Sequence, residues 1–234
     1  ITVVYNDLKR FKKTYLNICH EITLLPSKER KKIEYIVKDG NSTDALDEFM
    51  NNNILADINI KYFKLRDDGI YSAMNQAAQF ANGEYVLFIN AGDKLKSMAI
   101  EMILKYLGKS DIYGFNFELK GLVKEQKKFD RILYHRSPCH QGIISKKSIT
   151  NFTENFKLAS DFDFLLRNRN TIKWIDKTIS VFGEEKKSIE YQKQINREKI
   201  KILLNSDVPT VNKYLSILKL ILFNGVHSIN FISA

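Results

Sequence analysis

Cysteine is scarce in this chain of 234 residues, and its scarcity excludes several classes of protein. Cys19 and Cys139 are too few for a disulfide framework, and they lack the spacing of a structural metal site. Two isolated thiols suit a reducing compartment, so we expect a cytoplasmic protein.

Long apolar runs are also missing. No stretch reaches the roughly 18–20 consecutive apolar residues of a transmembrane helix. No signal peptide is visible, although the chain starts directly in a predicted strand, which leaves a trimmed N-terminus open. The sequence shows no internal repeat and no low-complexity linker. It therefore predicts one large globular domain, or a domain with an appendage, and 44% hydrophobic residues suffice for a sizeable core.

Acidic residues are fewer than basic ones. The chain has 37 Lys and Arg but only 27 Asp and Glu, which gives a net charge of +10. Such an excess indicates a polyanionic partner, namely nucleic acid, an anionic membrane face or a nucleoside diphosphate. The basic residues are spread along the chain, and no segment resembles a nucleic-acid-binding motif. We therefore expect no nucleic-acid partner.

The hydrophobic pattern predicts alternating strands and helices in the first half of the chain. Strands are expected at 1–5, 33–38, 58–65 and 84–89, and helices at 8–22, 45–51, 70–81 and 97–107. This order predicts a parallel, doubly wound α/β sheet. Further elements are a hairpin at 112–119 and 121–123, a basic loop at 124–131, short strands at 140–145 and 172–175, and lysine-rich helices from 183.

The most informative segment is residues 66–93, RDDGIYSAMNQAAQFANGEYVLFINAGD. Its apolar run ends abruptly at Asn90-Ala91-Gly92-Asp93, which places a carboxylate just past the carboxyl end of a buried strand. Open α/β sheets bind their ligands at that edge. Asp67 and Asp68 precede the helix of this unit, so acids flank it at both ends.

Several blocks, taken together and in this order, resemble the family 2 glycosyltransferases, in particular the bacterial branch that acts on surface polysaccharides. They are ITVVYND at 1–7, YIVKDGNSTD at 35–44, DGIYSAMN at 68–75, GEYVLFINAGD at 83–93 and, more weakly, ASDFD at 159–163. The resemblance covers about residues 1–182. It implies a GT-A type, Rossmann-like and mostly parallel domain over 1–182, with a nucleotide-sugar half at 1–93 and an acceptor half at 94–182. A helical C-terminal extension would follow over 183–234.

The resemblance also implies an inverting, hexosyltransferase-type enzyme. Its donor would be a nucleotide-sugar, with a preference for a UDP-sugar, and its acceptor a hydroxyl of a saccharide or lipid-linked saccharide. Asp39 would contact the nucleotide base, Asn6 the nucleoside, and Asp68 the donor sugar or ribose. Asn75 is either a donor contact or a core amide, because it is polar in an otherwise small and apolar helix. Asn90 offers a neutral oxygen to the ribose or a metal.

Asp93 is the predicted ligand of a divalent cation, Mn²⁺ or Mg²⁺, which would neutralise the departing diphosphate. Such a cation keeps several waters and takes only one or two protein carboxylates, so one Asp suffices. The alternative is an Asp that merely favours a strand–helix turn. We expect Asp93 to be a rim carboxylate that adds little to the core.

Asp161 is the predicted general base, which takes the proton of the acceptor hydroxyl as that oxygen attacks the anomeric carbon. Asp163 is the reserve candidate. The alternative is that Ser160 or Asp161 simply caps a helix. His140 and Gln141 resemble a cleft-facing pair of this branch and are predicted to contact acceptor or phosphate.

The C-terminal segment VNKYLSILKLILF, residues 211–223, has two interpretations. It predicts either a buried core or homo-oligomer helix, or an interfacial helix on an anionic membrane. In the second case lipid head groups would meet the lysines at positions 186, 187, 193, 199, 201, 213 and 219. The enzyme would then lie on the inner face of the plasma membrane, where a lipid-linked acceptor is found.

Two other function classes compete with the transferase. A nucleotidyltransferase shares the doubly wound core, but it usually carries a glycine- and arginine-rich phosphate loop after the first strand, and none follows residues 1–5. A non-catalytic sugar-binding relative would keep the fold but would have lost Asp93 or Asp161, and both are present.

Overall fold

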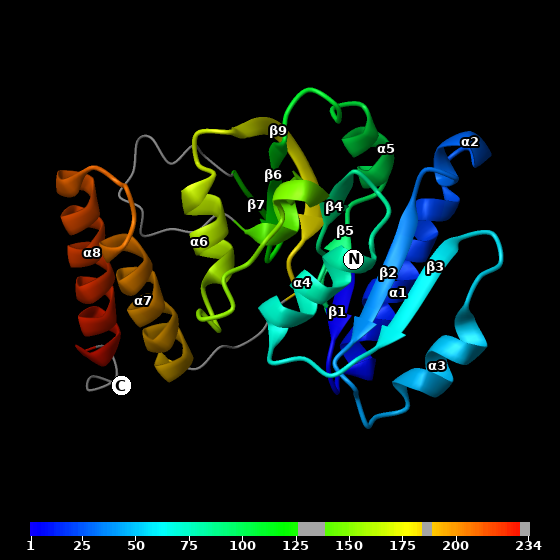
Figure 1. The fold of residues 1–234 in the computed structure, drawn as a ribbon, viewed down its shortest axis with the longest axis horizontal. Coiled ribbons are helices and arrows are strands. Elements are labelled where there is room, and N and C mark those ends of the chain that lie inside the picture. The colour runs from blue at the N-terminus through cyan, green and yellow to red at the C-terminus, as the bar shows by residue number, and fades with distance from the viewer. Residues whose placement is uncertain (126–138, 184–188, 230–234) are drawn as a thin grey trace. The chain divides into compact units, whose positions relative to one another are not determined.

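The structure is a computed structural model, and it describes residues 1–125, 139–183 and 189–229 (Figure 1). The chain forms two compact units. Unit 1 comprises Ile1–Gln126, Cys139–Phe152 and Thr171–Glu184, and unit 2 comprises Lys127–Pro138, Thr153–Asn170 and Glu185–Ala234. Most of the predicted basic loop at 124–131 lies outside the described residues. The predicted boundary between a domain at 1–182 and an extension at 183–234 stays a prediction.

Unit 1 begins with a parallel sheet of three strands in the order β1-β2-β3. The strands are β1 (Thr2–Val4), β2 (Glu34–Asp39) and β3 (Asn59–Lys64). In their register, Val4 pairs with Asp39 and Asp39 pairs with Lys64, so the three strands end side by side. The loops that follow them therefore share one edge of the sheet.

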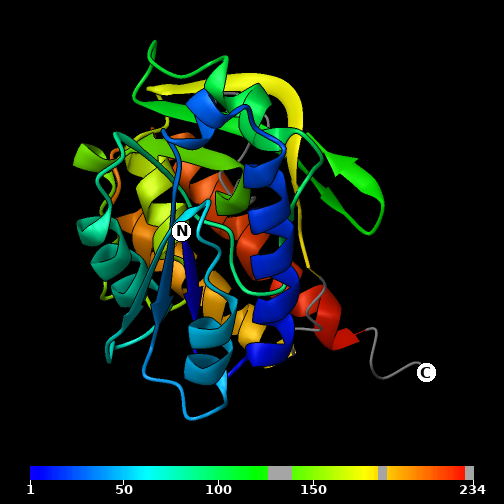
Figure 2. The same cartoon turned by 90° about the vertical axis from the view of Figure 1, so that its right-hand side faces the viewer.

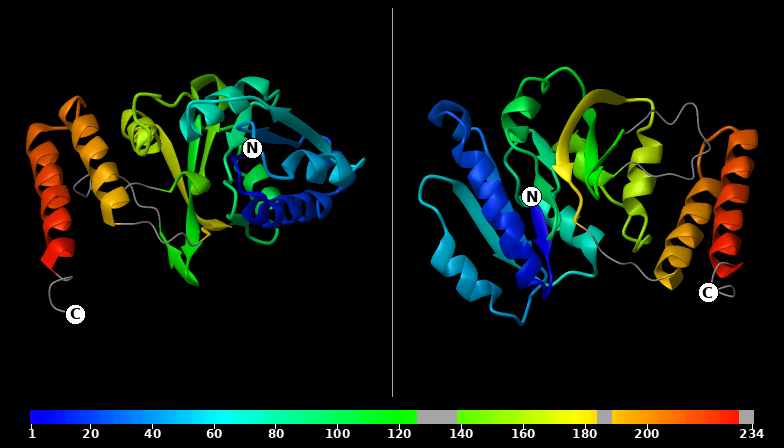
Figure 3. Two further views of the ribbon diagram at one scale, coloured as in Figure 1. Left: turned by 90° about the horizontal axis from the view of Figure 1, so that it is seen from below. Right: turned by 180° about the vertical axis from the view of Figure 1, so that it is seen from behind.

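Helices cover both faces of this parallel sheet, as Figures 2 and 3 show for α1 and α4. The helices of this region are α1 (Leu8–Thr23), the short unpredicted α2 (Ser27–Arg30), α3 (Leu46–Asn53) and α4 (Ile70–Phe80). The predicted apolar face of α1 is confirmed, because Phe11, Tyr15, Ile18 and Ile22 are buried in it. Tyr15 packs against Tyr35 of β2 and Phe49 of α3, so α1 anchors the core of the unit.

A second, mixed sheet continues unit 1 in the order β4-β8-β6-β9-β5, with β7 paired to β6. Its strands are β4 (Tyr85–Leu87), β5 (Lys94–Leu95), β6 (Ile112–Leu119), β7 (Leu122–Lys124), β8 (Ile143–Lys146) and β9 (Ile172–Val181). The hairpin predicted at 112–123 is confirmed as the antiparallel pair β6–β7. Among the described strands of this sheet, β6 and β9 are the pair that runs in parallel.

The fourth predicted strand, β4, was expected to pair in parallel, and this expectation is met on the side where it lies beside Ile1. Ile1 N–H donates to Leu87 O at 2.8 Å, and Ile89 N–H donates to Ile1 O at 2.9 Å, which is the pattern of a parallel neighbour. On its other side β4 pairs antiparallel with β8. An apolar run that is buried on both faces does not reveal its partners, because strand pairing depends on distant parts of the chain.

Three smaller features differ from the sequence-based expectations. Helix α5 (Ala99–Leu104) is shorter than predicted and follows Met98, whose φ is +61°. The strand predicted at 140–145 begins only at Ile143, because η2 (His140–Gly142) forms a 3₁₀ turn; a second 3₁₀ turn is η3 (Lys147–Ile149). The strand predicted at 172–175 is the first part of the longer β9.

Unit 2 confirms the helical C-terminal region and adds one helix from the middle of the chain. Its helices are α6 (Ser160–Arg167), α7 (Ile189–Leu204) and α8 (Thr210–Ile229), and α7 packs against α8 (Figure 1). Helix α8 buries Ser216, Ile217 and Leu220. Among the helices that the structure describes, none has both the length and the apolar character needed to cross a bilayer.

Candidate active site

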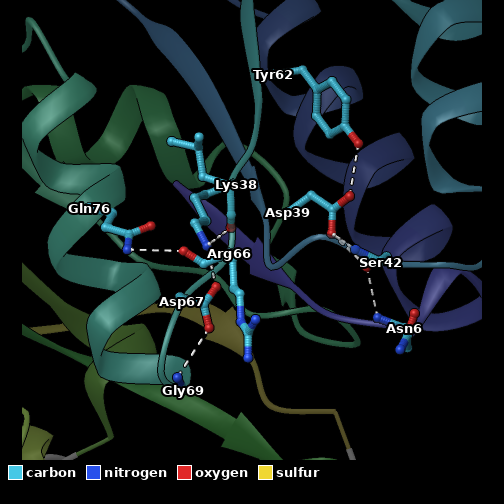
Figure 4. A network of polar contacts seen from close by, with 10 residues as sticks. Asn6, Lys38, Asp39, Ser42, Tyr62, Arg66, Asp67, Gly69 and Gln76 are labelled. Atoms are coloured by element: carbon cyan, nitrogen blue, oxygen red, sulfur yellow. Dashed lines mark hydrogen bonds and ion pairs between the residues drawn. The ribbon is translucent and has the colours of Figure 1, made fainter.

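Asp39 organises the first polar cluster, at the carboxyl edge of the parallel sheet (Figure 4). It is fully buried at the end of β2. Its Oδ1 accepts hydrogen bonds from the Ser42 N–H at 2.8 Å and the Ser42 hydroxyl at 2.5 Å, and its Oδ2 accepts one from the Tyr62 hydroxyl at 2.9 Å. The carboxylate therefore shapes the turn that follows the strand. A contact with the nucleotide base stays a prediction.

Tyr62 is a member of this cluster that the sequence did not single out. Its hydroxyl also contacts Asp47 on α3, so one phenolic proton lies between two carboxylates. Burial, followed by the two carboxylates, raises the pKa of Tyr62 far above its usual range. Tyr62 thus stays a neutral donor that holds Asp39 in place. Its only sequence signal is an aromatic residue in a strand, which is too common to be informative.

Asn6 clamps the same turn from the end of β1. Its N–H donates to Ser42 Oγ and its Oδ1 accepts the Thr43 N–H, both at 2.8 Å. Asp44 accepts the Leu8 N–H at 2.8 Å and so satisfies a backbone donor at the start of α1.

Tyr5 is a further residue at this edge that the sequence analysis missed, and its side chain is 65% exposed. A Cβ on Gly40 would lie 3.2 Å from the Tyr5 ring and 3.0 Å from Asp67 Oδ2. A larger residue at this position would therefore push one of these two side chains away from the turn. The sequence did offer an indication, because Tyr5 directly follows the first strand, and open α/β sheets bind their ligands at the carboxyl ends of the strands.

A buried ion pair fixes the neighbouring loop (Figure 4). Lys38 on β2 is fully buried, and its ammonium contacts Asp67 and donates to Leu65 O at 2.6 Å. Asp67 Oδ1 accepts the Gly69 N–H at 3.1 Å. The loop that carries the exposed Asp68 is thus tied to the sheet by a charge pair.

Replacing Lys38 by Met is expected to lower the free energy of unfolding by about 3–5 kcal/mol, because it leaves the Asp67 carboxylate largely buried without a counter-charge. Chemical denaturation measures this loss. Lys32→Met is the control, since Lys32 forms an exposed pair with Glu29 and should cost less than about 1 kcal/mol. Adding Asp67→Asn to Lys38→Met should recover part of the loss. Equal losses of unfolding free energy in Lys38→Met and Lys32→Met would contradict the assignment of Lys38 and Asp67 as a stabilising buried ion pair.

Asp93 is the centre of the second polar cluster, in the loop after β4. It is 4% exposed, its Oδ1 accepts the Gly183 N–H at 2.7 Å, and its Oδ2 accepts the Gln141 side-chain amide at 2.6 Å. The expectation of a rim carboxylate with little part in the core is therefore wrong. Burial raises the pKa of Asp93, and the hydrogen bonds from Gly183 and Gln141 oppose this shift in part.

Asn90 and His140 lie beside this carboxylate. Asn90 Nδ2 is 2.9 Å from His140 Nε2. In this arrangement the amide donates and the ring nitrogen accepts. Asn90 Oδ1 is buried and has no hydrogen-bond partner among the described residues. An unpaired buried oxygen is costly and indicates a missing partner, such as a water, a cation or a ligand donor.

Thr14 of α1 binds the backbone of the loop that carries Asp93. The sequence analysis did not single out this residue. Its hydroxyl donates to Asp93 O at 2.7 Å and accepts the Gly92 N–H at 2.9 Å. Gly92 has a φ of +101°, which favours glycine. A Cβ on Gly183 would lie 2.4 Å from Gly92 O, so a second glycine is needed just after β9, where the chain contacts Gly92. A polar residue three positions after Phe11, on the apolar face of α1, was the available signal.

The donor atoms of this cluster determine which cation it suits. Within residues 1–125, 139–183 and 189–229, no group of three or more His, Cys, Asp and Glu side chains could hold a metal. The cluster offers one carboxylate, with an amide oxygen and an imidazole nearby. Mg²⁺ and Mn²⁺ are commonly bound by one or two carboxylates together with substrate phosphates. The residues therefore fit a cation that arrives with a diphosphate, and they do not fit one held by protein alone.

Asn75 lies elsewhere in unit 1. Its Nδ2 donates to Phe152 O and its Oδ1 accepts the Phe152 N–H, both at 2.9 Å. Of the two interpretations of this residue, the contacts match the core amide.

Unit 2 contains both predicted base candidates, in the first turn of α6. Asp161 is half-buried, and its Oδ1 accepts the Phe162 N–H at 2.8 Å. Asp163 Oδ2 accepts the Thr153 hydroxyl at 2.7 Å and pairs with Arg167 Nε at 3.0 Å. The contacts of Asp163 are those of a structural carboxylate, and the role of Asp161 as the base stays a prediction.

Comparison with known sequences gives one family. The profile described as "Glycosyl transferase family 2" matches residues 1–164. A "PGL/p-HBAD biosynthesis glycosyltransferase" of Mycobacterium bovis is 28% identical over 152 residues, and the match covers 57% of this chain and 57% of that protein. An "uncharacterized glycosyltransferase" of Mycobacterium tuberculosis is 25% identical over 184 residues, covering 71% and 66%. The chain thus spans little more than half the length of the first relative.

Solved structures with the same fold are glycosyltransferases of the GT-A type. Staphylococcus aureus TarS 1-349 in complex with UDP-GlcNAc has a TM-score of 0.68 at 19% identity, with 94% of this chain and 70% of that chain covered. A mannosyltransferase of Pyrobaculum calidifontis in complex with GDP-Man and Mn²⁺ has a TM-score of 0.64 at 15% identity, with 94% and 67% covered. This likeness confirms the predicted GT-A fold. Since the family profile also spans most of the chain, this chain belongs to glycosyl transferase family 2.

Proposed function

We propose that the protein transfers a sugar from a UDP-sugar to a hydroxyl of a saccharide or lipid-linked saccharide in surface polysaccharide synthesis, with inversion at the anomeric carbon. The observation that carries the proposal is the cluster of Asn90, Asp93, His140 and Gln141, in which Asp93 and Gln141 are buried, in a chain of this family. TarS in complex with UDP and with UDP-GlcNAc supports a nucleotide-sugar donor. The mannosyltransferase in complex with GDP-Man makes guanine the base to test against uracil.

In this proposal the carboxyl edge of the parallel sheet receives the nucleoside. Asp39 and Asn6 hold the turn after β2, and the exposed ring of Tyr5 offers a flat apolar face beside it. Asp68 follows the loop that Lys38 fixes, and we keep its predicted role at the donor sugar or ribose. We leave Asn75 out of the donor site because its amide binds the Phe152 backbone.

The second cluster would receive the diphosphate. Asp93 would hold a divalent cation, with Asn90 Oδ1 and His140 close by, and the bound cation would neutralise charge on the leaving group. Gln141 and Gly183 keep the Asp93 carboxylate oriented through one hydrogen bond on each oxygen. Asp161 would take the proton from the acceptor hydroxyl, because transfer needs a base as that oxygen forms the new bond.

A release assay tests the proposed function. UDP-N-acetylglucosamine, UDP-glucose, UDP-galactose and GDP-mannose are each incubated with lipid-linked saccharides, with and without Mn²⁺, and nucleoside diphosphate is measured. We expect release from one UDP-sugar and a product whose anomeric configuration, read by NMR, is opposite to that of the donor. Retained configuration would exclude inversion. Release of pyrophosphate from a nucleoside triphosphate and a sugar phosphate would indicate a nucleotidyltransferase instead.

We also propose that α8 docks the enzyme on an anionic membrane. Its side away from α7 presents an exposed apolar stripe at helical spacing, formed by Val211, Tyr214, Leu215, Leu218, Ile221 and Leu222. Two of the lysines predicted to face lipid are engaged in the protein. Lys199 is buried over the Phe162 ring, so its predicted lipid contact is wrong, and Lys213 donates to Leu204 O and Ser206 O. Lys186 and Lys187 lie outside the described residues.

The stripe, supported by the exposed Lys201 and Lys219, would therefore supply most of the affinity for lipid. The double variant Leu215→Glu/Leu218→Glu should no longer co-sediment with vesicles of phosphatidylglycerol and phosphatidylethanolamine, whereas the wild type should. Gln194→Glu/Asn205→Glu adds the same charge at exposed polar positions and should still pellet.

Light scattering, which measures the oligomeric state, distinguishes the membrane-docking interpretation of α8 from the homo-oligomer interpretation. A wild type that ignores vesicles, but forms a dimer that the Leu215→Glu/Leu218→Glu variant breaks, would make α8 a subunit interface. Each exposed lysine contributes about 1 kcal/mol near such a surface, so salt should weaken the binding only in part.

A further inference from the structure

The start of α6 lacks a cap from its own sequence. Its N-cap residue is Ala159, which has no side-chain acceptor. The backbone N–H groups that precede the helix bind Glu198 of α7 instead. Glu198 Oε1 accepts the Lys157 N–H at 3.0 Å, and Oε2 accepts the Leu158 and Ala159 N–H groups at 2.8 and 2.9 Å. A single carboxylate thus satisfies three consecutive donors just before Asp161.

Lys199, the next residue of α7, contacts the other side of the same turn. It is 9% exposed, and its ammonium lies 5.3 Å from the ring centre of the fully buried Phe162. Two adjacent residues of α7 therefore hold the residues on both sides of Asp161. Asp161 itself accepts the Phe162 N–H, so its carboxylate moves with that backbone.

Charge-assisted hydrogen bonds of this kind are short and strong, and three of them on one carboxylate leave the bound backbone little freedom. A general base must be held within hydrogen-bond reach of the proton that it takes, and a displacement of about 1 Å can cost about a hundredfold in rate. The turn that carries Asp161 is short and has no cap of its own, so its position depends on α7.

We infer that Glu198 is a positioning residue for the catalytic base, and that α7 of the C-terminal region is therefore a working part of the transferase. The inference rests on the proposed role of Asp161. Glu198 acts through the backbone of 157–159 and does not touch substrate. Lys199 supports the same turn through the Phe162 ring.

Unit 2 supplies a matched control. Asp207, in the loop after α7, pairs with Arg169 beyond the other end of α6 at 2.8 Å. Asp207→Asn removes a charged contact between the same two segments without touching the turn of Asp161. Any general weakening of their packing should appear in both variants, whereas loss of positioning should appear only in Glu198 variants.

Kinetics on the UDP-sugar that the release assay identifies test the inference. Glu198→Ala should lower kcat by about a hundredfold, with the donor KM and the affinity for UDP within about twofold of wild type. Glu198→Gln keeps one acceptor oxygen and should lose less. Asp207→Asn should keep wild-type kcat. Equal kcat losses in Glu198→Ala and Asp207→Asn, or none in Glu198→Ala, would overturn the inference.

The decisive comparison is between the effect of Glu198→Ala in the wild-type enzyme and its effect in the Asp161→Asn variant. If Glu198 acts through the base, adding Glu198→Ala to Asp161→Asn should lower kcat no further, whereas a loss as large as in the wild-type background overturns the inference. If Asp161→Asn turns over like wild type, the base assignment and this inference fall together, while the release assay still decides the transferase function. Hydrogen exchange gives a readout independent of the donor. The amides of 157–159 should exchange faster in Glu198→Ala and not in Asp207→Asn, and unchanged exchange in Glu198→Ala would overturn the inference.

Discussion

Asp93→Asn is expected to abolish sugar transfer while the chain stays folded. The amide keeps the size of the carboxylate and can still bind Gly183 and Gln141, provided that the Gln141 amide turns over. It lacks the charge that would hold the cation, whose stabilisation of the leaving group is worth several kcal/mol, so turnover should fall by about a thousandfold or more. The release assay with Mn²⁺ measures this loss.

The raised pKa of Asp93 gives this prediction a second, pH-dependent readout. Because burial raises the pKa in the folded state, the charged form destabilises the fold at neutral pH, and this cost disappears as the pH falls through the raised pKa. Asp93→Asn should therefore be at least as stable as wild type at neutral pH, and the difference should shrink in acid. Mn²⁺ binding in the presence of UDP should weaken over the same range, since protons compete for the carboxylate.

The control for this experiment is Asp111→Asn, which removes a surface carboxylate that pairs with Lys146 in the same unit. It should leave both turnover and Mn²⁺ affinity unchanged. Full activity of Asp93→Asn, or of wild type in excess chelator, would remove Asp93 from the proposed metal site.

Asp161→Asn is expected to lower turnover by about two orders of magnitude or more, the scale of general acid–base catalysis. The amide oxygen can still accept the Phe162 N–H, so the turn should keep its shape. Donor affinity should barely change, because the base acts on the acceptor. Steady-state kcat and calorimetric binding of UDP separate the two effects.

Asp163→Asn is the matched variant two positions further along α6. It loses the charge that pairs with Arg167, but it keeps an acceptor for the Thr153 hydroxyl. We expect a small loss of stability and nearly normal turnover. The reverse pattern, with Asp163→Asn inactive and Asp161→Asn active, would make Asp163 the base. Weak UDP binding with normal turnover in Asp161→Asn would place Asp161 at the nucleotide.

The sequence by itself determined the order of the main strands and helices in the first half of the chain and the sheet edge at which the predicted nucleoside residues lie. Strand ends and turns are local features, because apolar runs stop at polar turn residues such as Asn90 and Asp93. Parallel strands then bring the ends of β1, β2 and β3 together, so Asn6, Asp39 and Asp68 follow strands at one edge. The buried face of α1 could also be predicted from the sequence, since its apolar residues repeat with the helical period.

Only the tertiary structure decided what surrounds these residues. The burial of Asp93 depends on Gln141 and Gly183, and its loop depends on Thr14, all of which are distant in the sequence. The pairing of β4 with β8 is likewise long-range.

The same holds for the C-terminal region. Its sequence is apolar almost all round, and only packing against α7 divides α8 into a buried side and an exposed stripe. The attachment of Glu198 to the backbone before Asp161 leaves no trace in composition or periodicity, because backbone N–H groups carry no sequence signal. A pattern in the sequence specifies which face of an element is apolar, whereas the partner of that face, and of each buried charge, is determined by contacts that only the folded chain makes.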